Sequence, residues 1–539
     1  MVRRSRFLSL ALLVVSVPVA LAVGNVEKLT SASGDTIVTL EWSLPSDPTF
    51  VGALVLARAG SPVADAPVDG QVYQVGDPIG SSTVVCQTTA LEESCEDTSV
   101  SNGTVVHYKV FGRDATPNYA SGVAIKGIPR SAAQVRWAVT TEASALGALG
   151  AVPGSYLVGT GNDALLHRMD ENSGRNGPWD PPVLGGAAQG RPMVGDIVPG
   201  TGDYTAFVSS QNGYLYRYSL DDSATLDGLR NVADEAGCTG GMLQSSAVAM
   251  IDAFDDNTNN NDNVLIQATR CGATDNKIML YSHDLGTYFD SYAGGADGLG
   301  ISSATPIILY RHDANNLVYV PVDDDGGESL VVLSVDSGPS FPEPPFAVLS
   351  SIGDVRCTPA MFLRNQDALM VVANTSGDLH LYLATVRTGS AGSPLYELGS
   401  YAGGDGPVKG VAASTTISVP PLFENWVVWA TDTLVHGIKV GGDGRFDALS
   451  YWEVAIAGAS APLVLRNVTT AGDVLAYVGA AGGMLYELNA LNHGAVSRSW
   501  AVDDAALTLG DPTFDYNDGS NQGIVIGSTG GTYHWVPIN

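Results

Sequence analysis

Short apolar runs separated by glycine-containing turns recur along most of this chain. Two clear copies of the unit are "TAFVSSQNGYLYRYSLDD" at 205–222 and "LAYVGAAGGMLYELNALNHGAVSRSWAVD" at 475–503. The first run of a unit tends to carry a proline after a small residue, the second usually ends in a glycine turn, and the third is rich in leucine and tyrosine. Because glycine supplies the positive φ of tight hairpins, the pattern predicts antiparallel strands.

The units hold four strands each and repeat about every 40 to 50 residues, which is typical of a β-propeller. A single four-stranded sheet has two apolar faces and cannot cover both. In a ring, each sheet covers the face of the next. The predicted fold class is therefore all-β. Counting from residue 145 we predict eight blades, with seven as the alternative if the loosely patterned first or sixth unit is not a blade.

The two ends of the repeat region complement each other. The last unit stops at Asn539, directly after its third strand, and a lone strand, "QVRWAVT" at 134–140, precedes the first full unit. We therefore predict that the strand near Trp137 completes the last blade and closes the ring, which hides two sheet edges.

The units "VSSQNGYLYRYSLD" and "VGAAGGMLYELNALNHG" resemble the repeats of quinoprotein-like (PQQ-type) propellers. The resemblance implies the architecture of residues 131–539. Quinoprotein dehydrogenases use a vicinal cysteine pair, a bound calcium and many tryptophan docking motifs, none of which is evident in this sequence. Binding relatives of the same fold use no cofactor, so the resemblance does not imply oxidation chemistry.

Residues 1–22 have the pattern of a secretory signal peptide. Arg3, Arg4 and Arg6 form a basic head, Phe7 to Val19 form an apolar run, and Ala20-Leu21-Ala22 fits a small-residue cleavage site. No later segment is apolar enough to span a bilayer. We expect a secreted or cell-surface protein without a transmembrane segment in the mature chain, or a periplasmic one if the host is Gram-negative.

Residues 23–130 predict a sandwich of two antiparallel sheets, because short alternating runs such as "TIVTLEWSLP" and "TVVHYKVFGRD" are spaced by turns. Trp42, Tyr108 and the "PNYASG" tail resemble a fibronectin type III domain. That resemblance implies a spacer or adhesion module.

Five cysteines fit an oxidising compartment. We predict a disulfide between Cys86 and Cys95, which lie close in sequence. Cys238 and Cys271 flank one expected hairpin and form a second candidate pair. Cys357 is then left over, and a buried free thiol is the expectation for it.

Charge and motifs exclude several classes of function. The formal net charge is −30, and such an acidic surface repels phosphate backbones, so no nucleic-acid partner is expected. The eight histidines are scattered singly, and the sequence contains no HExxH, GxSxG or P-loop motif. We predict no cofactor and no catalytic residues.

Two acidic clusters carry the alternative of a calcium site. They comprise Asp252, Asp255, Asp256 and Asp262 in "DAFDDNTNNNDN", and Asp323, Asp324 and Asp325 in "VDDDGGE". Loops of this kind can supply the six to eight oxygens that calcium requires. Solvated polar turns are the simpler interpretation of both.

These features predict an exported, non-enzymatic binding or scaffold protein whose propeller face holds a protein or glycan partner. One alternative is a propeller enzyme, either a quinoprotein-like oxidoreductase or a hydrolase, working at the central funnel. Another is a structural subunit of a cell-surface assembly or filament.

Overall fold

The computed structural model describes most of the residues that follow the predicted signal peptide. The described residues are 23–142, 149–152, 155–176, 179–188, 190–196, 204–220, 225–238, 243–244, 248–250, 264–270, 277–293, 307–309, 316–322, 328–335, 340–341, 347–350, 352–364, 367–384, 396–414, 425–466, 473–517 and 521–538. Within these ranges no helix is long and apolar enough to cross a membrane.

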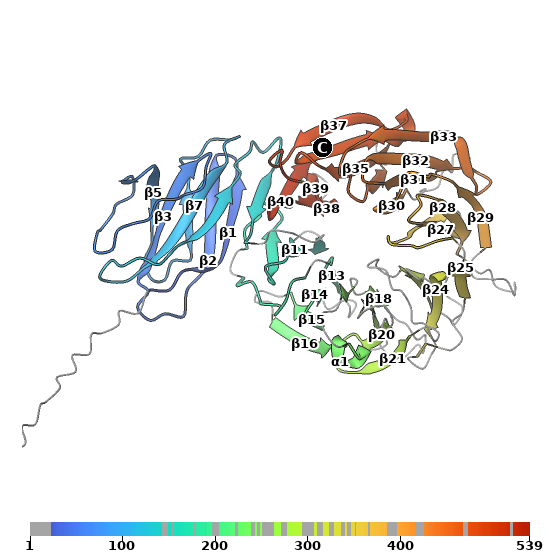
Figure 1. Cartoon of the computed structure of the whole chain (residues 1–539), viewed down its shortest axis with the longest axis horizontal. Helices are drawn as coiled ribbons and strands as arrows, with labels where there is room; N and C mark the ends of the chain where they lie inside the picture. The colour runs from blue at the N-terminus through green and yellow to red at the C-terminus, as the bar shows by residue number, and fades with distance from the viewer. Residues whose placement is uncertain are drawn as a thin grey trace, which may run out of the picture.

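The amino-terminal strands form two antiparallel sheets packed face to face (Figure 1). One contains β1 (Glu27–Gly34), β2 (Ile37–Ser43) and β6 (Ser94–Asp97), and the other contains β4 (Pro78–Ile79), β5 (Ser82–Gln87), β3 (Gly52–Ala59), β7 (Val106–Arg113) and β8 (Val123–Gly127). Trp42 and Tyr108 are buried between them, and the Tyr108 hydroxyl donates a 3.0 Å hydrogen bond to Asp97. The alternating apolar runs therefore form a two-sheet sandwich. Its likeness to fibronectin type III domains stays a prediction.

The remaining strands form small antiparallel sheets arranged as a ring (Figure 1). In chain order the sheets comprise β10 (Gly150–Val152), β11 (Tyr156–Thr160) and β12 (Leu166–Asp170); β13 (Met193–Asp196), β14 (Tyr204–Ser209), β15 (Tyr214–Ser219) and β16 (Thr225–Asn231); β17 (Leu243–Gln244), β18 (Val248–Met250), β19 (Val264–Arg270), β20 (Lys277–Ser282) and β21 (Tyr288–Tyr292); β22 (Ile307–Leu309), β23 (Asn316–Pro321), β24 (Glu328–Val335) and β25 (Ala347–Ser350); β26 (Ala360–Arg364), β27 (Asp367–Ala373), β28 (Leu379–Leu383) and β29 (Tyr396–Tyr401); β30 (Gly410–Ala413), β31 (Asn425–Ala430), β32 (Leu434–Val440) and β33 (Phe446–Ala455); β34 (Leu463–Arg466), β35 (Val474–Ala480), β36 (Met484–Asn489) and β37 (Ala495–Ala501); and β38 (Thr513–Asn517), β39 (Asn521–Gly527) and β40 (Thr532–Pro537). A short helix, α1 (Val232–Ala236), follows β16, and a 3₁₀ turn, η1 (Ala490–Asn492), follows β36.

The apolar cores lie between neighbouring sheets rather than within them. One core joins Phe207 and Leu215 of the β13–β16 sheet to Leu265 and Met279 of the following sheet. Clusters of the same kind link each later pair of neighbours and return from the β38–β40 sheet to the β10–β12 sheet. Each sheet thus buries its faces against the next, as predicted for a propeller, and the all-β propeller prediction is confirmed. The count of eight blades stays a prediction, because undescribed segments interrupt several sheets.

The strand near Trp137 closes the ring as predicted. Strand β9 (Trp137–Thr140) pairs antiparallel with β40, with Trp137 opposite Trp535 and Thr140 opposite Thr532. The hydroxyls of Thr140 and Thr532 lie 3.0 Å apart in this buried seam. Because β9 comes from the start of the propeller region and β40 from its end, their pairing closes the ring.

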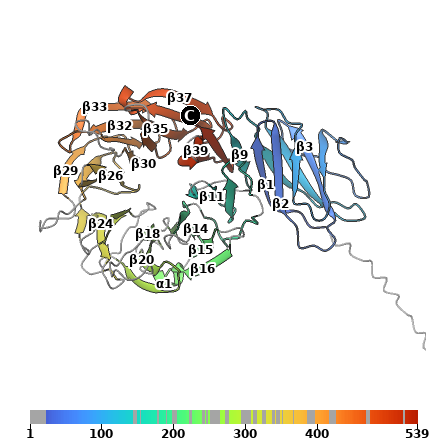
Figure 2. The same ribbon diagram turned by 180° about the vertical axis from the view of Figure 1, so that it is seen from behind.

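Strand β9 has a second partner that the sequence did not predict. Its other edge pairs with β1 of the sandwich, with Ala32 opposite Val139, so that a single seven-stranded sheet runs from β38 through β9 to β6 (Figure 2). Beside the seam, Lys126 of the sandwich lies 3.7 Å from the buried Asp503 carboxylate of the propeller. The sandwich and the ring are therefore joined by a ladder of backbone hydrogen bonds. The predicted boundary between residues 130 and 131 falls just before the shared strand.

Candidate functional site

A cleft of about 730 Å³ separates the sandwich from the first sheet of the ring. Its sandwich wall consists of the start of β1, the end of β2 and the turn that leads into the first residue of β6, and its propeller wall is the loop that follows β12. The lining residues are Lys28, Glu41, Trp42, Ser43, Leu44, Leu91, Glu92, Glu93, Ser94, Arg175, Asn176, Trp179, Asp180 and Pro181. Clefts between domains are frequent binding sites, because two walls can contact the same partner.

Charged pairs hold the propeller loop against the sandwich. The Arg175 guanidinium donates to Glu41 at 2.9 Å, and the backbone N–H of Asn176 donates to the other oxygen of the same carboxylate at 3.0 Å. Lys28 donates to Asp180 at 2.8 Å. These contacts come from both sides of the cleft, so they fix the distance between its walls.

Two sandwich side chains, those of Lys28 and Ser43, donate hydrogen bonds to the Asp180 carboxylate of the propeller. Partial burial alone would raise the pKa of its carboxyl, but hydrogen bonds from Lys28 and Ser43 outweigh this and lower the pKa below its usual value. The carboxylate is therefore ionised at neutral pH. Glu41 and Asp180 are both paired with cationic side chains. Glu92 and Glu93 are exposed at the edge of the cleft, in the turn before β6, and their charges make this rim of the cleft acidic.

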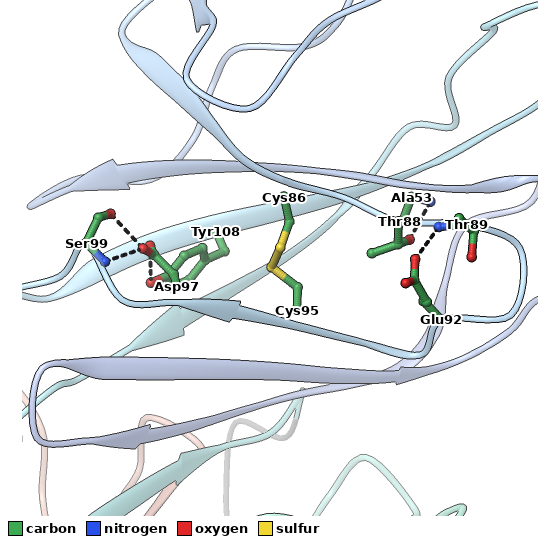
Figure 3. Close-up of a disulfide and its surroundings, with 9 residues drawn as sticks. All are labelled: Ala53, Cys86, Thr88, Thr89, Glu92, Cys95, Asp97, Ser99 and Tyr108. Carbon is green, nitrogen blue, oxygen red and sulfur yellow. Dashed lines mark hydrogen bonds between the residues drawn. A yellow bond between two sulfur atoms is a disulfide. The ribbon is translucent and has the colours of Figure 1, made fainter.

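A disulfide fixes the turn that carries this acidic rim. Cys86 on β5 and Cys95 on β6 are bonded, with Cα atoms 6.2 Å apart, and thereby join the two sheets of the sandwich (Figure 3). Between them, Thr89 donates its backbone N–H to Glu92 at 2.6 Å, and the Thr88 hydroxyl accepts from the backbone of Ala53 at 3.0 Å (Figure 3). Leu91 lies in this turn and is 87% exposed at the cleft.

The structure accounts for some of the residues that the sequence singled out. The predicted Cys86–Cys95 disulfide is present, Cys238 is disulfide-bonded, and Cys357 is a buried free thiol whose pKa burial raises to about 12. The predicted partner of Cys238 and all the calcium candidates lie outside the described residues, namely Cys271, Asp252, Asp255, Asp256, Asp262, Asp323, Asp324 and Asp325. The calcium interpretation therefore stays a prediction.

Sequence reasoning missed the cleft itself. It assigned Trp42 to the sandwich core, where the side chain is 4% exposed, and it gave no role to Arg175 or Trp179. These residues come from the sandwich and from the ring, which the β1–β9 pairing joins, and a pairing between two separately recognised domains leaves no periodic signal. The one available signal was the Cys86–Cys95 spacing, which marked the turn at the rim.

No protein-family model matches the chain, and no curated protein matches it. The crystal structure of BamB from Moraxella catarrhalis is similar with a TM-score of 0.47 and 15% identity, covering 75% of this chain and 97% of that chain. BBS1N, solved in complex with ARL6DN in a crystal soaked with mercury, gives a TM-score of 0.40 at 8% identity and covers 65% of this chain and 91% of that chain. The propeller fold of this chain is established by its own sheet order and inter-sheet cores.

Proposed function

We propose that this chain is an exported, non-enzymatic binding protein that holds a protein partner in the cleft between its sandwich and its propeller. The observation that carries the proposal is that both parts of the molecule build one cleft whose walls cannot separate freely. The β1–β9–β40 ladder fixes the two parts on one side, and the Arg175–Glu41 and Lys28–Asp180 pairs fix them in the cleft. A preformed site loses less entropy when a partner binds.

The chemistry of the rim favours a protein partner. Leu91 offers a large exposed apolar group, and Glu92 and Glu93 follow it directly in the chain. An apolar contact surrounded by charge is the usual arrangement of a protein interface, with the apolar group excluded from water and the charges selecting the partner. The partner surface that fits this rim is an apolar side chain beside lysine or arginine.

Site-specific cross-linking tests this proposal. A photoreactive benzoylphenylalanine replaces Leu91, and a matched variant carries it at Leu449, which is 94% exposed on the outer strand β33. Irradiation of intact cells that export the protein is expected to yield a discrete adduct from position 91 and none from position 449. Glu92→Lys with Glu93→Lys is expected to weaken that adduct by repelling a basic partner.

The outcomes separate the alternatives. Adducts of the same size from both positions, or no adduct from position 91, would contradict the proposal. An adduct whose digestion yields peptides foreign to this chain supports a protein partner, whereas an adduct that glycosidases return to the size of this chain alone would replace it with a glycan. Cys86→Ser with Cys95→Ser is expected to reduce the yield at position 91, because the turn is then no longer fixed to both sheets.

A further inference from the structure

Three side chains of types that can bind a metal ion meet at the boundary of the β26–β29 and β30–β33 sheets, which lie on the far side of the ring from the sandwich (Figure 1). Asp405 lies in the loop between β29 and β30, His436 on β32, and Glu453 on β33. One potential ligand atom from each residue lies within 4.8 Å of the others. His436 is fully buried, whereas Asp405 and Glu453 are exposed, so solvent reaches the two carboxylates.

Strand pairing explains why two of the three residues are neighbours. His436 and Glu453 stand directly opposite each other in the β32–β33 ladder, so their side chains share one face of the sheet. Asp405 reaches the same point from the preceding sheet, on a loop in which Gly404 and Gly406 have φ values of 67° and 96°. That left-handed backbone is open to glycine and strained for other residues, so the two glycines set the path that brings Asp405 to the imidazole.

Hydrogen bonding settles where the His436 proton lies. The Tyr451 hydroxyl donates its only proton to Oε2 of Glu453 at 2.7 Å, and the Tyr451 hydroxyl oxygen lies 2.9 Å from Nδ1 of His436. The hydroxyl can therefore only accept from Nδ1, which must carry a hydrogen. In the neutral ring Nε2 then presents a lone pair.

That lone pair has no donor. Nε2 of His436 is buried and has no hydrogen-bond partner among the described residues, and the nearest carboxylate oxygen, Oδ2 of Asp405, lies 3.7 Å away. This separation is too long for a hydrogen bond, although it is within ion-pair reach if the ring carries two protons. A neutral imidazole here presents a lone pair beside the negative Oδ2 of Asp405, an arrangement that a cation between the two atoms would stabilise.

Aromatic packing fixes the ring in this orientation. The Trp429 indole stacks on the His436 imidazole with centroids 4.9 Å apart and planes within 12°. Tyr401 packs against Tyr451 at 5.2 Å, which holds the hydroxyl that orients the imidazole. Histidine ligands in proteins usually have their second nitrogen hydrogen-bonded in this way.

We propose that Asp405, His436 and Glu453 bind one divalent transition-metal cation. Two ligands at about 2.1 Å from a tetrahedral zinc ion are about 3.4 Å apart, close to the 3.7 Å between Nε2 and Oδ2 of Asp405. The imidazole favours zinc or a similar metal over calcium or magnesium, which prefer oxygen ligands alone. Three protein ligands leave a fourth position for water. This inference does not depend on the proposed partner-binding function.

Calorimetric titration of Zn²⁺ into the full mature chain tests the site. The protein carries no histidine tag and is first treated with EDTA and exchanged into a non-chelating buffer. The expected result is one Zn²⁺ per chain, with affinity at least tenfold lower in Asp405→Asn and in Glu453→Gln. Both variants change exposed carboxylates to amides of the same shape, so they are expected to fold normally.

The matched control is Asp432→Asn in the turn between β31 and β32 of the same sheet. Asp432 is also an exposed carboxylate, but it pairs with Lys409 at 2.8 Å and lies outside the cluster, so its loss is expected to leave zinc binding unchanged. Failure of the unaltered protein to bind Zn²⁺, or equal affinity in the Asp405 and Glu453 variants, would overturn the proposal. Tighter binding of Ca²⁺ than of Zn²⁺ in a parallel titration would overturn the assigned class of cation.

Discussion

Two histidines occupy the same place in two sheets of the ring, and their surroundings give them different properties. His436 and His534 each lie on the third strand of a sheet, fully buried, and each approaches an aspartate from the loop that enters that sheet. In the last sheet Nε2 of His534 lies 3.1 Å from Asp503, whereas in the β30–β33 sheet the corresponding distance to Asp405 is 3.7 Å. The contact between His534 and Asp503 is a hydrogen bond, and we call these two residues the closed pair. The separation between His436 and Asp405 is too long for a hydrogen bond, and we call these two residues with Glu453 the open set.

The neighbouring strand produces much of this difference. Across the ladder from His436 stands Glu453, and across the ladder from His534 stands Ala138 of β9. In the last sheet the Asp503 side chain is 1% exposed and also lies near Lys126 of the sandwich, whereas Asp405 has no sandwich beside it and is 37% exposed. The strand that closes the ring therefore places an alanine where the β30–β33 sheet has Glu453, and Lys126 of the sandwich lies beside the buried aspartate. The same position of the repeat thus holds a buried histidine–aspartate pair in the sheet that contacts the sandwich. In the β30–β33 sheet, away from the sandwich, it holds the histidine of the proposed metal site.

The largest expected effect comes from breaking the closed pair. Asp503→Asn removes a buried charge that His534 and Lys126 contact, and we expect the free energy of unfolding to fall by about 3 kcal/mol. Asp405→Asn, at the matching exposed position, is expected to change it by no more than about 0.5 kcal/mol without metal. Urea unfolding of both variants measures the contrast, and equal losses would contradict it.

Zinc is expected to stabilise only through the open set. At a free Zn²⁺ concentration one hundred times the dissociation constant, one-site linkage raises the free energy of unfolding by about 2.7 kcal/mol. We expect this gain in the unaltered protein and in Asp503→Asn, whereas an affinity at least tenfold lower leaves Asp405→Asn a gain of no more than about 1.4 kcal/mol at the same Zn²⁺ concentration. Thermal unfolding with and without Zn²⁺ measures it, and an undiminished gain in Asp405→Asn would place the bound ion elsewhere.

A smaller effect is expected from the residue that orients His436. Tyr451→Phe keeps the ring packing but removes the hydroxyl that accepts the hydrogen bond from Nδ1 of His436. We expect zinc affinity to fall about tenfold, or about 1.4 kcal/mol, while the stoichiometry stays at one ion per chain. Calorimetry provides both values. Unchanged affinity would show that this hydrogen bond does not position the imidazole.

The smallest effect is the acid response of the closed pair. Burial alone would raise the pKa of Asp503, but the hydrogen bond from His534 and the charges of His534 and Lys126 lower it well below its usual value. Because the folded-state pKa is depressed, this stabilisation is present above the unfolded pKa of about 4 and is lost as the pH falls toward the folded-state pKa. We expect about 1 kcal/mol of this stabilisation to be lost between pH 7 and pH 3, and Asp503→Asn to abolish that part of the pH dependence.

The repeat could be predicted from the sequence because each sheet repeats the same local rules. Apolar alternation and glycine turns placed the strands, and the unpaired run around Trp137 predicted ring closure, which the β9–β40 pairing confirms. Burial between sheets follows from composition and period, since an isolated sheet of this kind leaves apolar faces in water.

The cleft and the cation set could not be predicted in this way. In the sequence His436 is one of eight scattered histidines. Asp405 and Glu453 lie on separate segments, and only the fold brings them to His436. The acidic clusters of the sequence, such as Asp252 to Asp262, stood out because their residues are adjacent in the chain. A signal did exist in the repeat itself, since His436 and His534 share one register and only His436 faces an acidic residue across the ladder.

Anomalous X-ray scattering at the zinc edge tests the contrast between the two sheets most directly. Crystals of the mature protein grown with one equivalent of Zn²⁺ are measured on both sides of the edge. We predict a single anomalous peak bounded by Oδ2 of Asp405, Nε2 of His436 and the Glu453 carboxylate, with none at His534 and Asp503. A peak at the His534–Asp503 pair, or none at the Asp405–His436–Glu453 set, would contradict the account.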